Sequence, residues 1–327
     1  MIALKPELYK KNYIKIYYLE KYTRIIFYIL ILLFLSYPIY KKILSLNSVK
    51  SFLIVKDQLG MIDAKFKQID ENGNIIEIFA DKAIHKGQSI LIFDNITATN
   101  NYNNNQINLV ADRAAYNKNN KELFFNNNVH ISQQNDFKLV SRESIYNISK
   151  SLIKGNAKIE FENYVGRFLA DSYELFTEKK LYYFNDNIII FLNSDRKNAE
   201  ISSNSIIVDD SNFVIIANDN PKYNDHELFL SGDELIIYYK RDINKQIIID
   251  NILVNNNVRV KHKDSIVTGD KAVFYNGINE IEIIDNVNLK QENNLLKGAR
   301  LKYNLLDSSI RVLDSDKSKL ELKYEKK

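Results

Sequence analysis

The sequence of 327 residues has no cysteine, no tryptophan, three prolines and nine glycines. The lack of cysteine excludes a disulfide framework and any thiol chemistry. With so few glycines, and with no GxGxxG or GxxxxGK[ST] motif, the sequence argues against a nucleotide-binding loop. The 45 Lys and Arg nearly balance the 41 Asp and Glu, and the basic residues are scattered. Such a charge distribution argues against a nucleic-acid-binding protein.

No group of residues has the pattern of a catalytic or metal site. None of the histidines stands at the spacing of a zinc-ligand pair, and we expect all four at the surface; they are His85, His130, His226 and His262. No nucleophile elbow or HExxH motif occurs. Asp81, Asp112 and Asp171 recur in equivalent places, which favours a structural role. We therefore predict no catalytic residue, no metal and no cofactor.

An apolar segment near the N-terminus predicts a membrane helix. Residues 25–40 (IIFYILILLFLSYPIY) are uncharged, and a helix over them would be about 24 Å long at ~1.5 Å per residue. Extending it to Leu46, with Lys41 and Lys42 reaching the headgroups, lets it cross a bilayer. Residues 1–24 are basic, which places them in the cytoplasm and the chain after the helix outside. The alternative is a cleaved signal peptide, but no small-x-small cleavage site follows the segment.

After residue 50 the sequence shows short alternating apolar runs separated by Asn, Asp and Gly, which indicates an all-β protein. A self-similar unit recurs every 29 to 37 residues and begins with a small residue, which we call the anchor, five positions before a bulky one. The predicted anchors are Ala80, Ala111, Ser141, Ala170, Ser202, Gly232, Gly269 and Gly298. Such regular spacing predicts a repeat architecture in which neighbouring units bury each other's apolar faces.

A second recurring element is an apolar run interrupted by Asp-Asn or Asn-Asn. It occurs in the segments that start at Leu91, Leu123, Tyr183, Leu253 and Glu282. Asn and Asp tolerate left-handed backbone conformations, so this element predicts a bend within a strand. A ladder of cation ligands is the alternative, but calcium-binding repeats need Gly-rich acidic loops that are absent here.

Each unit holds two strands, so eight units predict about sixteen antiparallel strands stacked along one axis. Alternation places the following residues on the inner face: Ile78, Ala80, Leu91, Phe93, Leu109, Ala111, Phe125, Val129, Ile131, Leu139, Phe168 and Ala170. The small anchors leave room between two apolar sheets. This room fits either a ligand channel or close packing, and the pattern alone favours a dry core.

Two segments carry a resemblance to a known family. The first segment runs from Ile62 to His85 and reads IDAKFKQIDENGNIIEIFADKAIH. It follows a basic N-terminus and a predicted helix, and in this place it resembles the start of an LptC periplasmic domain. INLVADRAAYNKNNKELFFNNNVHI, from Ile107 to Ile131, is similar to the OstA-like repeat. The chain thus resembles the LptC family, with further OstA/LptA-like repeats. The resemblance implies an open, twisted β-jellyroll, LptC-like over residues 47–200 and continued by additional repeats over residues 201–327.

The resemblance also implies a function, which is non-enzymatic lipid transfer. An inner-membrane protein of this family accepts lipopolysaccharide from the LptF/LptG-like subunits of an ABC exporter. It holds the lipid in an apolar groove, here the twelve inner residues named above, and passes it to an LptA-like or LptD-like periplasmic β-jellyroll. We expect a strand containing Phe52 and Ile54 to dock on the exporter. The alternatives are an anchored β-solenoid scaffold without lipid, and a glycan-active enzyme, for which the sequence offers little.

Overall fold

The computed structural model describes residues 60–69, 75–86, 89–102, 105–134, 136–243, 246–291, 294–313 and 321–324. The contacts divide the chain into two units, Met1–Asp57 and Gln58–Lys327, and every described residue belongs to the second. Within this described part no helix is long and apolar enough to cross a membrane. The helix predicted over residues 25–46 and the predicted docking residues Phe52 and Ile54 lie outside the described residues.

The described residues form 22 β-strands and two single-turn 3-10 helices. The strands of the first half are β1 (Gly60–Ile69), β2 (Ile75–Lys86), β3 (Ile90–Tyr102), β4 (Asn105–Asn117), β5 (Glu122–Gln133), β6 (Phe137–Asn147), β7 (Leu152–Gly155), β8 (Ile159–Asn163), β9 (Gly166–Ala170), β10 (Ser172–Phe176) and β11 (Leu181–Leu192). The second half contains β12 (Glu200–Asp209), β13 (Val214–Asn218), β14 (Lys222–Asn224), β15 (Leu228–Ser231), β16 (Glu234–Arg241), β17 (Ile247–His262), β18 (Ser265–Tyr275), β19 (Glu280–Gln291), β20 (Asn294–Asn304), β21 (Ile310–Leu313) and β22 (Glu321–Tyr324). The 3-10 helices are η1 (Ile148–Lys150) and η2 (Asn276–Ile278).

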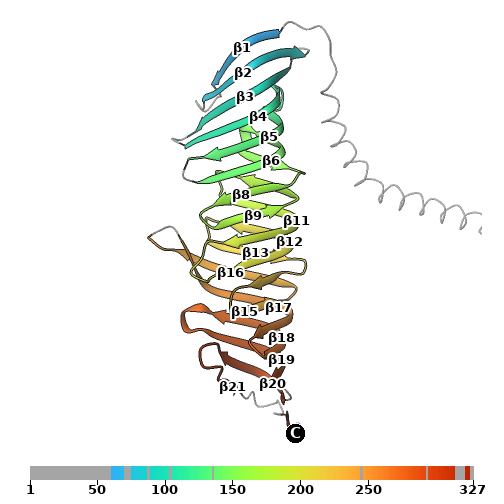
Figure 1. Cartoon of the computed structure of the whole chain (residues 1–327), viewed down its shortest axis with the longest axis vertical. Helices are drawn as coiled ribbons and strands as arrows, with labels where there is room; N and C mark the ends of the chain where they lie inside the picture. Colours follow the sequence, from blue (N-terminus) through green and yellow to red (C-terminus); the bar gives the residue numbers. More distant parts are fainter. Residues whose placement is uncertain are drawn as a thin grey trace, which may run out of the picture. The chain divides into compact units, whose positions relative to one another are not determined.

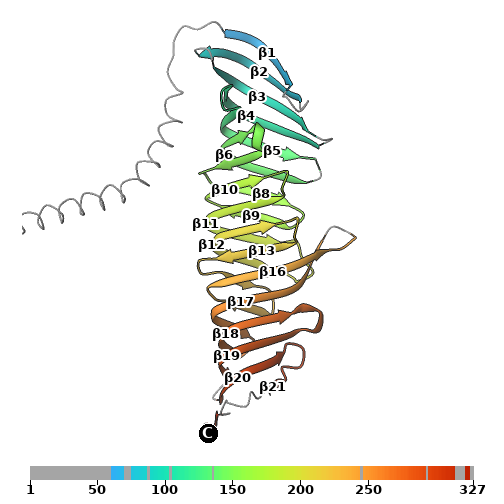
Figure 2. The ribbon, with the colours of Figure 1, turned by 180° about the vertical axis from the view of Figure 1, so that it is seen from behind.

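The strands stack in chain order, each pass of the chain pairing antiparallel with the next (Figure 1, and from behind in Figure 2). Five consecutive pairs, β7/β8, β9/β10, β13/β14, β15/β16 and β21/β22, are the two halves of one pass, so the 22 described strands make 17 passes. The predictions of an all-β protein and of about sixteen stacked antiparallel strands are therefore confirmed. The expected division at residue 200 falls at the start of β12, which pairs with β11.

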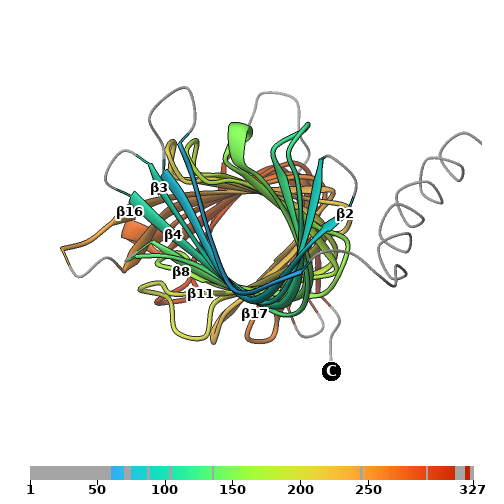
Figure 3. The ribbon, with the colours of Figure 1, turned by 90° about the horizontal axis from the view of Figure 1, so that it is seen from above.

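Each pass bends near its middle, so its halves lie in two walls (Figure 3). Wall A contains, for example, residues 105–111 of β4 and 129–133 of β5, and wall B contains 113–117 and 122–126 of the same strands. The bends follow one another along a line that we call the crease. The turns between passes lie along the far margin of each wall, and we call these margins the turn edges.

Asparagine residues with a left-handed backbone conformation form the crease. Asn127 and Asn128 have φ of 58° and 49°, and the register between β5 and both of its neighbours shifts at this point. Positive φ also occurs at Asn95, Asp186, Asn187, Asn256, Asn257, Asp285 and Asn286. These are the positions of the recurring Asp-Asn and Asn-Asn pairs. The predicted bend within the strand is thus confirmed.

The aspartate that follows each of five anchors clamps the crease of the next pass. The Nδ2 of Asn128 donates to the Oδ2 of Asp112 at 2.9 Å. The equivalent pairs are Asn95–Asp81 at 2.7 Å, Asn187–Asp171 at 2.6 Å, Asn257–Asp233 at 3.0 Å and Asn286–Asp270 at 2.6 Å. The left-handed Asn can reach the carboxylate because it points out of the bend. The structural role expected for the repeated aspartates is therefore this clamp.

The anchors Gly232 and Gly269 are small because a crease lies directly against them. A Cβ on Gly232 would lie 2.5 Å from Cγ1 of Val254 and 2.8 Å from the carbonyl oxygen of Asn256. One predicted anchor is wrong by a residue. Ser203, not Ser202, is buried opposite Ile188, and its Oγ donates to a carbonyl of the neighbouring pass. Irregular pairing at the bend between β11 and β12 hides this one-residue offset from the sequence.

Candidate binding interior

The inner faces of the two walls form one contiguous apolar core. All twelve residues predicted to face inward are buried, with exposed fractions of 6% or less. They are Ile78, Ala80, Leu91, Phe93, Leu109, Ala111, Phe125, Val129, Ile131, Leu139, Phe168 and Ala170. Strict alternation along straight half-strands explains this agreement, because the crease separates two segments that each keep a period of two. Their expected role in holding a lipid stays a prediction.

Small side chains line the N-terminal end of this core. Six alanines of β1–β4 belong to this core, and they come from both walls. They are Ala64, Ala80, Ala83, Ala98, Ala111 and Ala114. An alanine fills far less of the space between two walls than a leucine or phenylalanine does. At this end the alanines stand among larger buried side chains such as Phe93 and Ile96.

Aromatic rings fill the core further along, at β6–β11. Five buried rings, which we call the aromatic cluster, are Phe137, Phe161 and Phe168 of wall A with Tyr182 and Phe184 of wall B. The ring centroid of Phe161 lies 5.3 Å from that of Tyr182 and 5.7 Å from that of Phe184. Phe168 stacks on Phe184 at 5.0 Å. These distances are typical of favourable ring contacts, so the two walls touch through the core here.

Polar contacts join the turn edge of wall A to the turn edge of wall B near the aromatic cluster. The Nζ of Lys180, in a turn of wall B, lies 3.9 Å from the Oδ1 of Asp136, in a turn of wall A. The guanidinium of Arg241, at the end of β16, stacks 3.7 Å from the ring centre of Tyr164 in the β8–β9 turn. Arg241 also pairs with the buried Asp210 at 2.9 Å. These side chains hold the far margins of the walls together.

The segment Asn193–Ala199, which we call the strap, crosses from wall A to wall B through backbone hydrogen bonds. The N–H of Ile247 at the start of β17 donates to the carbonyl of Asn193 at 3.0 Å, and the N–H of Asp195 donates to the carbonyl of Ile247 at 3.1 Å. Ser194 and Ile247 form a parallel bridge. In cross-section the two walls form a V that opens between the turn edges. The strap closes this opening at its level, because its backbone pairs with Ile247 of wall B.

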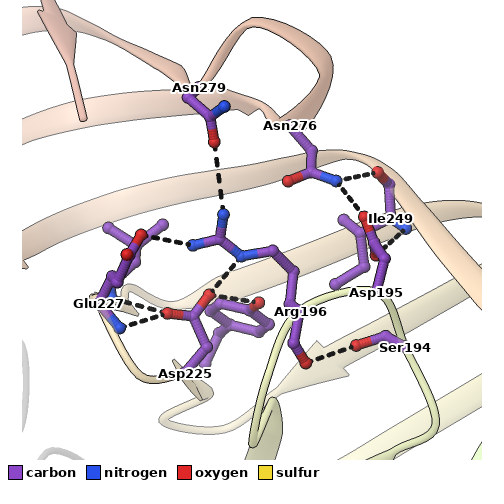
Figure 4. Close-up of polar contacts among 10 residues, drawn as sticks. Ser194, Asp195, Arg196, Asp225, Glu227, Ile249, Asn276 and Asn279 are labelled. Carbon is purple, nitrogen blue, oxygen red and sulfur yellow. Dashed lines mark hydrogen bonds and ion pairs between the residues drawn. The ribbon is translucent and has the colours of Figure 1, made fainter. Parts of the chain in front are cut away.

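Arg196 lies at the centre of the strap's polar contacts (Figure 4). Its Nε donates to the Oδ2 of Asp225 at 2.8 Å, and its Nη1 donates to Asn279 in wall B. The guanidinium also lies 5.3 Å from the ring centre of Phe274. Burial raises the pKa of Asp225, but the hydrogen bond from Arg196 and two backbone N–H groups outweigh it, so the net pKa lies below the usual range. Asp225 is thus held as a carboxylate.

The second buried aspartate, Asp210, behaves differently. Burial raises its pKa above the usual value, and the hydrogen bonds from Tyr239 and Arg241 offset this only in part. Arg241 is 34% exposed, whereas the side chain of Arg196 is 13% exposed. The two arginine–aspartate pairs therefore differ, because Asp225 also accepts two backbone N–H groups, whereas the nearby carboxylate of Asp136 raises the pKa of Asp210 further.

Buried tyrosines and one histidine also stand where the turn edges meet. Tyr146 accepts a hydrogen bond from Asn100 at 2.6 Å across the walls, and burial raises its pKa to about 12. The Nδ1 of His262 lies 2.8 Å from the hydroxyl oxygen of Tyr303. His262 is 2% exposed, so the expectation that all four histidines lie at the surface is wrong for this one. Burial lowers its pKa, which favours the neutral ring.

The sequence does not reveal the contacts that join the turn edges. The bonds from Arg196 to Asn279 and from Asn276 to Asp195 span 83 and 81 residues, and no local pattern marks partners so far apart. One signal was present in the sequence. The strap interrupts the alternation between β11 and β12 with the polar run SDRKNA, residues 194–199.

Two family models match the chain. The model described as lipopolysaccharide-assembly, LptC-related, matches residues 25–167, and the model of OstA-like protein matches residues 229–321. These two matches support an LptC-like protein with an OstA-like segment. The Ala-lined end and the predicted residues Leu109 and Phe125 lie in the LptC match, whereas β17–β20 lie in the OstA-like match.

Comparison with curated proteins gives no match. Among solved structures, one similar chain is LptH of Pseudomonas aeruginosa, described as the LptA homologous periplasmic component of the conserved lipopolysaccharide transport device. It is 13% identical, the alignment covers 40% of this chain and 96% of LptH, and the TM-score is 0.35. The family matches support involvement in lipopolysaccharide transport, and LptC-like families transport lipid rather than catalyse reactions.

Proposed function

We propose that this chain is a non-enzymatic carrier of lipopolysaccharide, anchored in the inner membrane by residues 25–46 with its N-terminus in the cytoplasm. The walls of the periplasmic part take the acyl chains between them, while the sugar head stays in water outside the turn edges. Residues 47–200 form the LptC-like part, and residues 201–327 extend the same stack toward the outer membrane.

The observation that carries this proposal is the Ala-lined end of the core. An acyl chain exposed to water loses about 0.8 kcal/mol per CH₂ relative to burial, so a carrier has to offer continuous apolar surface. Ala80, Ala98 and Ala111 offer such surface while filling little of the space between the walls. This end lies within the LptC-family match. The residues proposed to contact lipid are the twelve inner residues listed above, with Phe125 and Ile131 near their centre.

Partners follow from the two ends of the stack. In the proposal, a strand containing Phe52 and Ile54 pairs with an LptF/LptG-like exporter subunit, and the C-terminal passes dock an LptA-like or LptD-like β-jellyroll. Exposed apolar side chains on β1 support a contact near the first of these ends, since Met61, Ile62 and Ile69 are 52%, 81% and 62% exposed. Replacing Ile54 with proline removes a backbone donor and is expected to weaken co-purification with the exporter. Unchanged co-purification would argue against the docking strand.

The test of lipid carriage places a photo-cross-linking amino acid at Phe125 in cells that make lipopolysaccharide. Asn119, an exposed residue in the turn after β4, is the matched outward control. We expect lipopolysaccharide to be captured at Phe125 and not at Asn119. Capture at neither position, with folded protein present, would refute carriage.

A scaffold without lipid cargo is the second candidate, and the aromatic cluster is the observation that favours it. There the two walls touch through buried rings and leave the core filled. The cross-linking experiment separates the two functions, because a scaffold predicts no capture at Phe125.

A further inference from the structure

Contacts join the turn edges at several levels of the stack, since Asn100–Tyr146 and His262–Tyr303 also cross between the walls, and some of them lie beside the aromatic cluster. Phe161, Phe168 and Phe184 fill the core between β8 and β11, and Lys180, in the turn before β11, bridges the turn edges. The strap follows β11 directly. We propose that these elements form a gate, which has to open before an acyl chain can pass from the Ala-lined end to the OstA-like end. This inference rests on the proposed lipid carriage.

The cluster closes the core to an acyl chain. Phe161, Phe168 and Phe184 are fully buried, and Phe161 contacts rings of both walls. Protein cores are packed to the density of organic crystals, so a chain of methylenes cannot pass between rings in contact. Passage therefore requires these side chains to change rotamer or the walls to part.

The turn edges close the path of the polar head at the same level. A head that stays in water while its acyl chains move between the walls has to travel along the line where the turn edges face each other. Lys180 with Asp136, Arg241 with Tyr164, and the strap with Ile247 all cross this line. These contacts have to separate before the head can move past them.

Two features of the closed state favour opening. Lys180 is 40% exposed, and an exposed ion pair stabilises a fold little. The hydroxyl of Tyr182, inside the aromatic cluster, is buried without a hydrogen-bond partner among the described residues. Because an unpaired buried polar group is costly, the closed cluster is less than optimal. The crease clamps lie on the opposite side of each wall and need not break for the turn edges to part.

The chain has no cysteine, so a single engineered disulfide can lock the gate. Ser194 and Ile247 are paired across the turn edges. Paired strands lie about 4.8 Å apart, within the Cα separation of about 4.4–6.8 Å that a disulfide spans. In full-length protein in cells, Ser194→Cys with Ile247→Cys is combined with a photo-cross-linker at Phe125 or at Ile283, a buried residue of β19 beyond the gate.

We expect the oxidised pair to lower capture of lipopolysaccharide at Ile283 at least fivefold while capture at Phe125 persists. Reduction should restore capture at Ile283. The matched control is Thr268→Cys with Asn288→Cys, which links two neighbouring strands of wall A and spans no turn edge. This control should leave both capture sites unchanged.

Phe168→Leu provides a second test that keeps an apolar side chain and needs no disulfide. Losing the stack on Phe184 should raise the ratio of capture at Ile283 to capture at Phe125. The gate is refuted if the oxidised pair leaves Ile283 capture intact, or if Ile283 never captures lipid while Phe125 does. Absence of capture at Phe125 in the otherwise unmodified chain would instead refute lipid carriage, and the gate with it.

Discussion

Replacing one anchor glycine with alanine tests whether the anchors are small because of the crease. A Cβ at Gly232 would lie 2.5 Å from Cγ1 of Val254 and 2.8 Å and 3.0 Å from the carbonyl oxygens of Asn256 and Asn255. Two of these three atoms belong to the backbone of the neighbouring crease, which cannot rotate away. Overpacking of this kind costs about 1–3 kcal/mol, and the lower entropy of the unfolded alanine chain returns only about 0.4–1 kcal/mol.

Gly298 is the matched control, because it is the equivalent anchor two units further on. A Cβ there would meet Cγ1 of Val312 at 3.5 Å, which is ordinary van der Waals contact. Gly298→Ala should therefore be neutral or stabilising by up to about 1 kcal/mol. Gly232→Ala should lower the melting temperature, by about 2 °C for each kcal/mol in a unit of this length.

The assay is thermal unfolding of the unit Gln58–Lys327, followed by the far-ultraviolet circular dichroism of its strands. We expect the melting temperature of Gly232→Ala to lie about 2–6 °C below that of Gly298→Ala, from the energies above. Equal melting temperatures for the two variants would show that the crease accommodates a methyl group, and the steric reason for the small anchors would be wrong.

Three further predictions concern single contacts. Asn286→Ala should destabilise the unit by about 1 kcal/mol or more, and Asn286→Gly by less, because glycine keeps the positive φ and loses only the bond to Asp270; equal losses in urea unfolding would contradict this. Arg196→Met should cost about 3–5 kcal/mol because it leaves the carboxylate of Asp225 buried, and adding Asp225→Asn should recover part of the loss; an additive double variant would contradict the pairing. Burial lowers the pKa of His262 in the folded state, so the unfolded chain binds the proton more readily, and stability should fall as the pH drops below about 6.5. His262→Gln should remove this part of the pH dependence of the melting temperature. An unchanged dependence in the variant would refute the prediction.

The sequence was sufficient for the features whose causes are local. A left-handed Asn needs no distant partner to bend a strand, so the pairs at Asn127 and Asn286 could be recognised from their neighbours alone. Alternation on each side of the bend then determined which residues face inward, and all twelve predicted positions are buried. The expected role of the repeated aspartates could be inferred from their repetition, although their partners, the crease asparagines, could not.

Other features depended on geometry that no local pattern carries. The anchor at Ser203 rather than Ser202 is one case, because a shift of one residue at an irregular bend exchanges the two faces. The strap is a longer-range case, because its function depends on where β17 begins more than fifty residues later. The filling of the core by rings at β6–β11 likewise depends on which passes face each other.

The separation of the crease from the turn edges gives the stack a preferred way to deform. At the crease, passes such as β5 and β19 bend through a positive-φ backbone, five Asn–Asp clamps join neighbouring passes, and the clamps lie outside the core. At the turn edges, the walls meet through side chains and one short backbone bridge. Opening there would leave every strand-to-strand ladder within a wall intact. The side chains that fill the core can therefore change from alanines to aromatic rings along the stack without altering the crease. The filling of the core and the strength of the contacts between the turn edges can then differ from one level to the next.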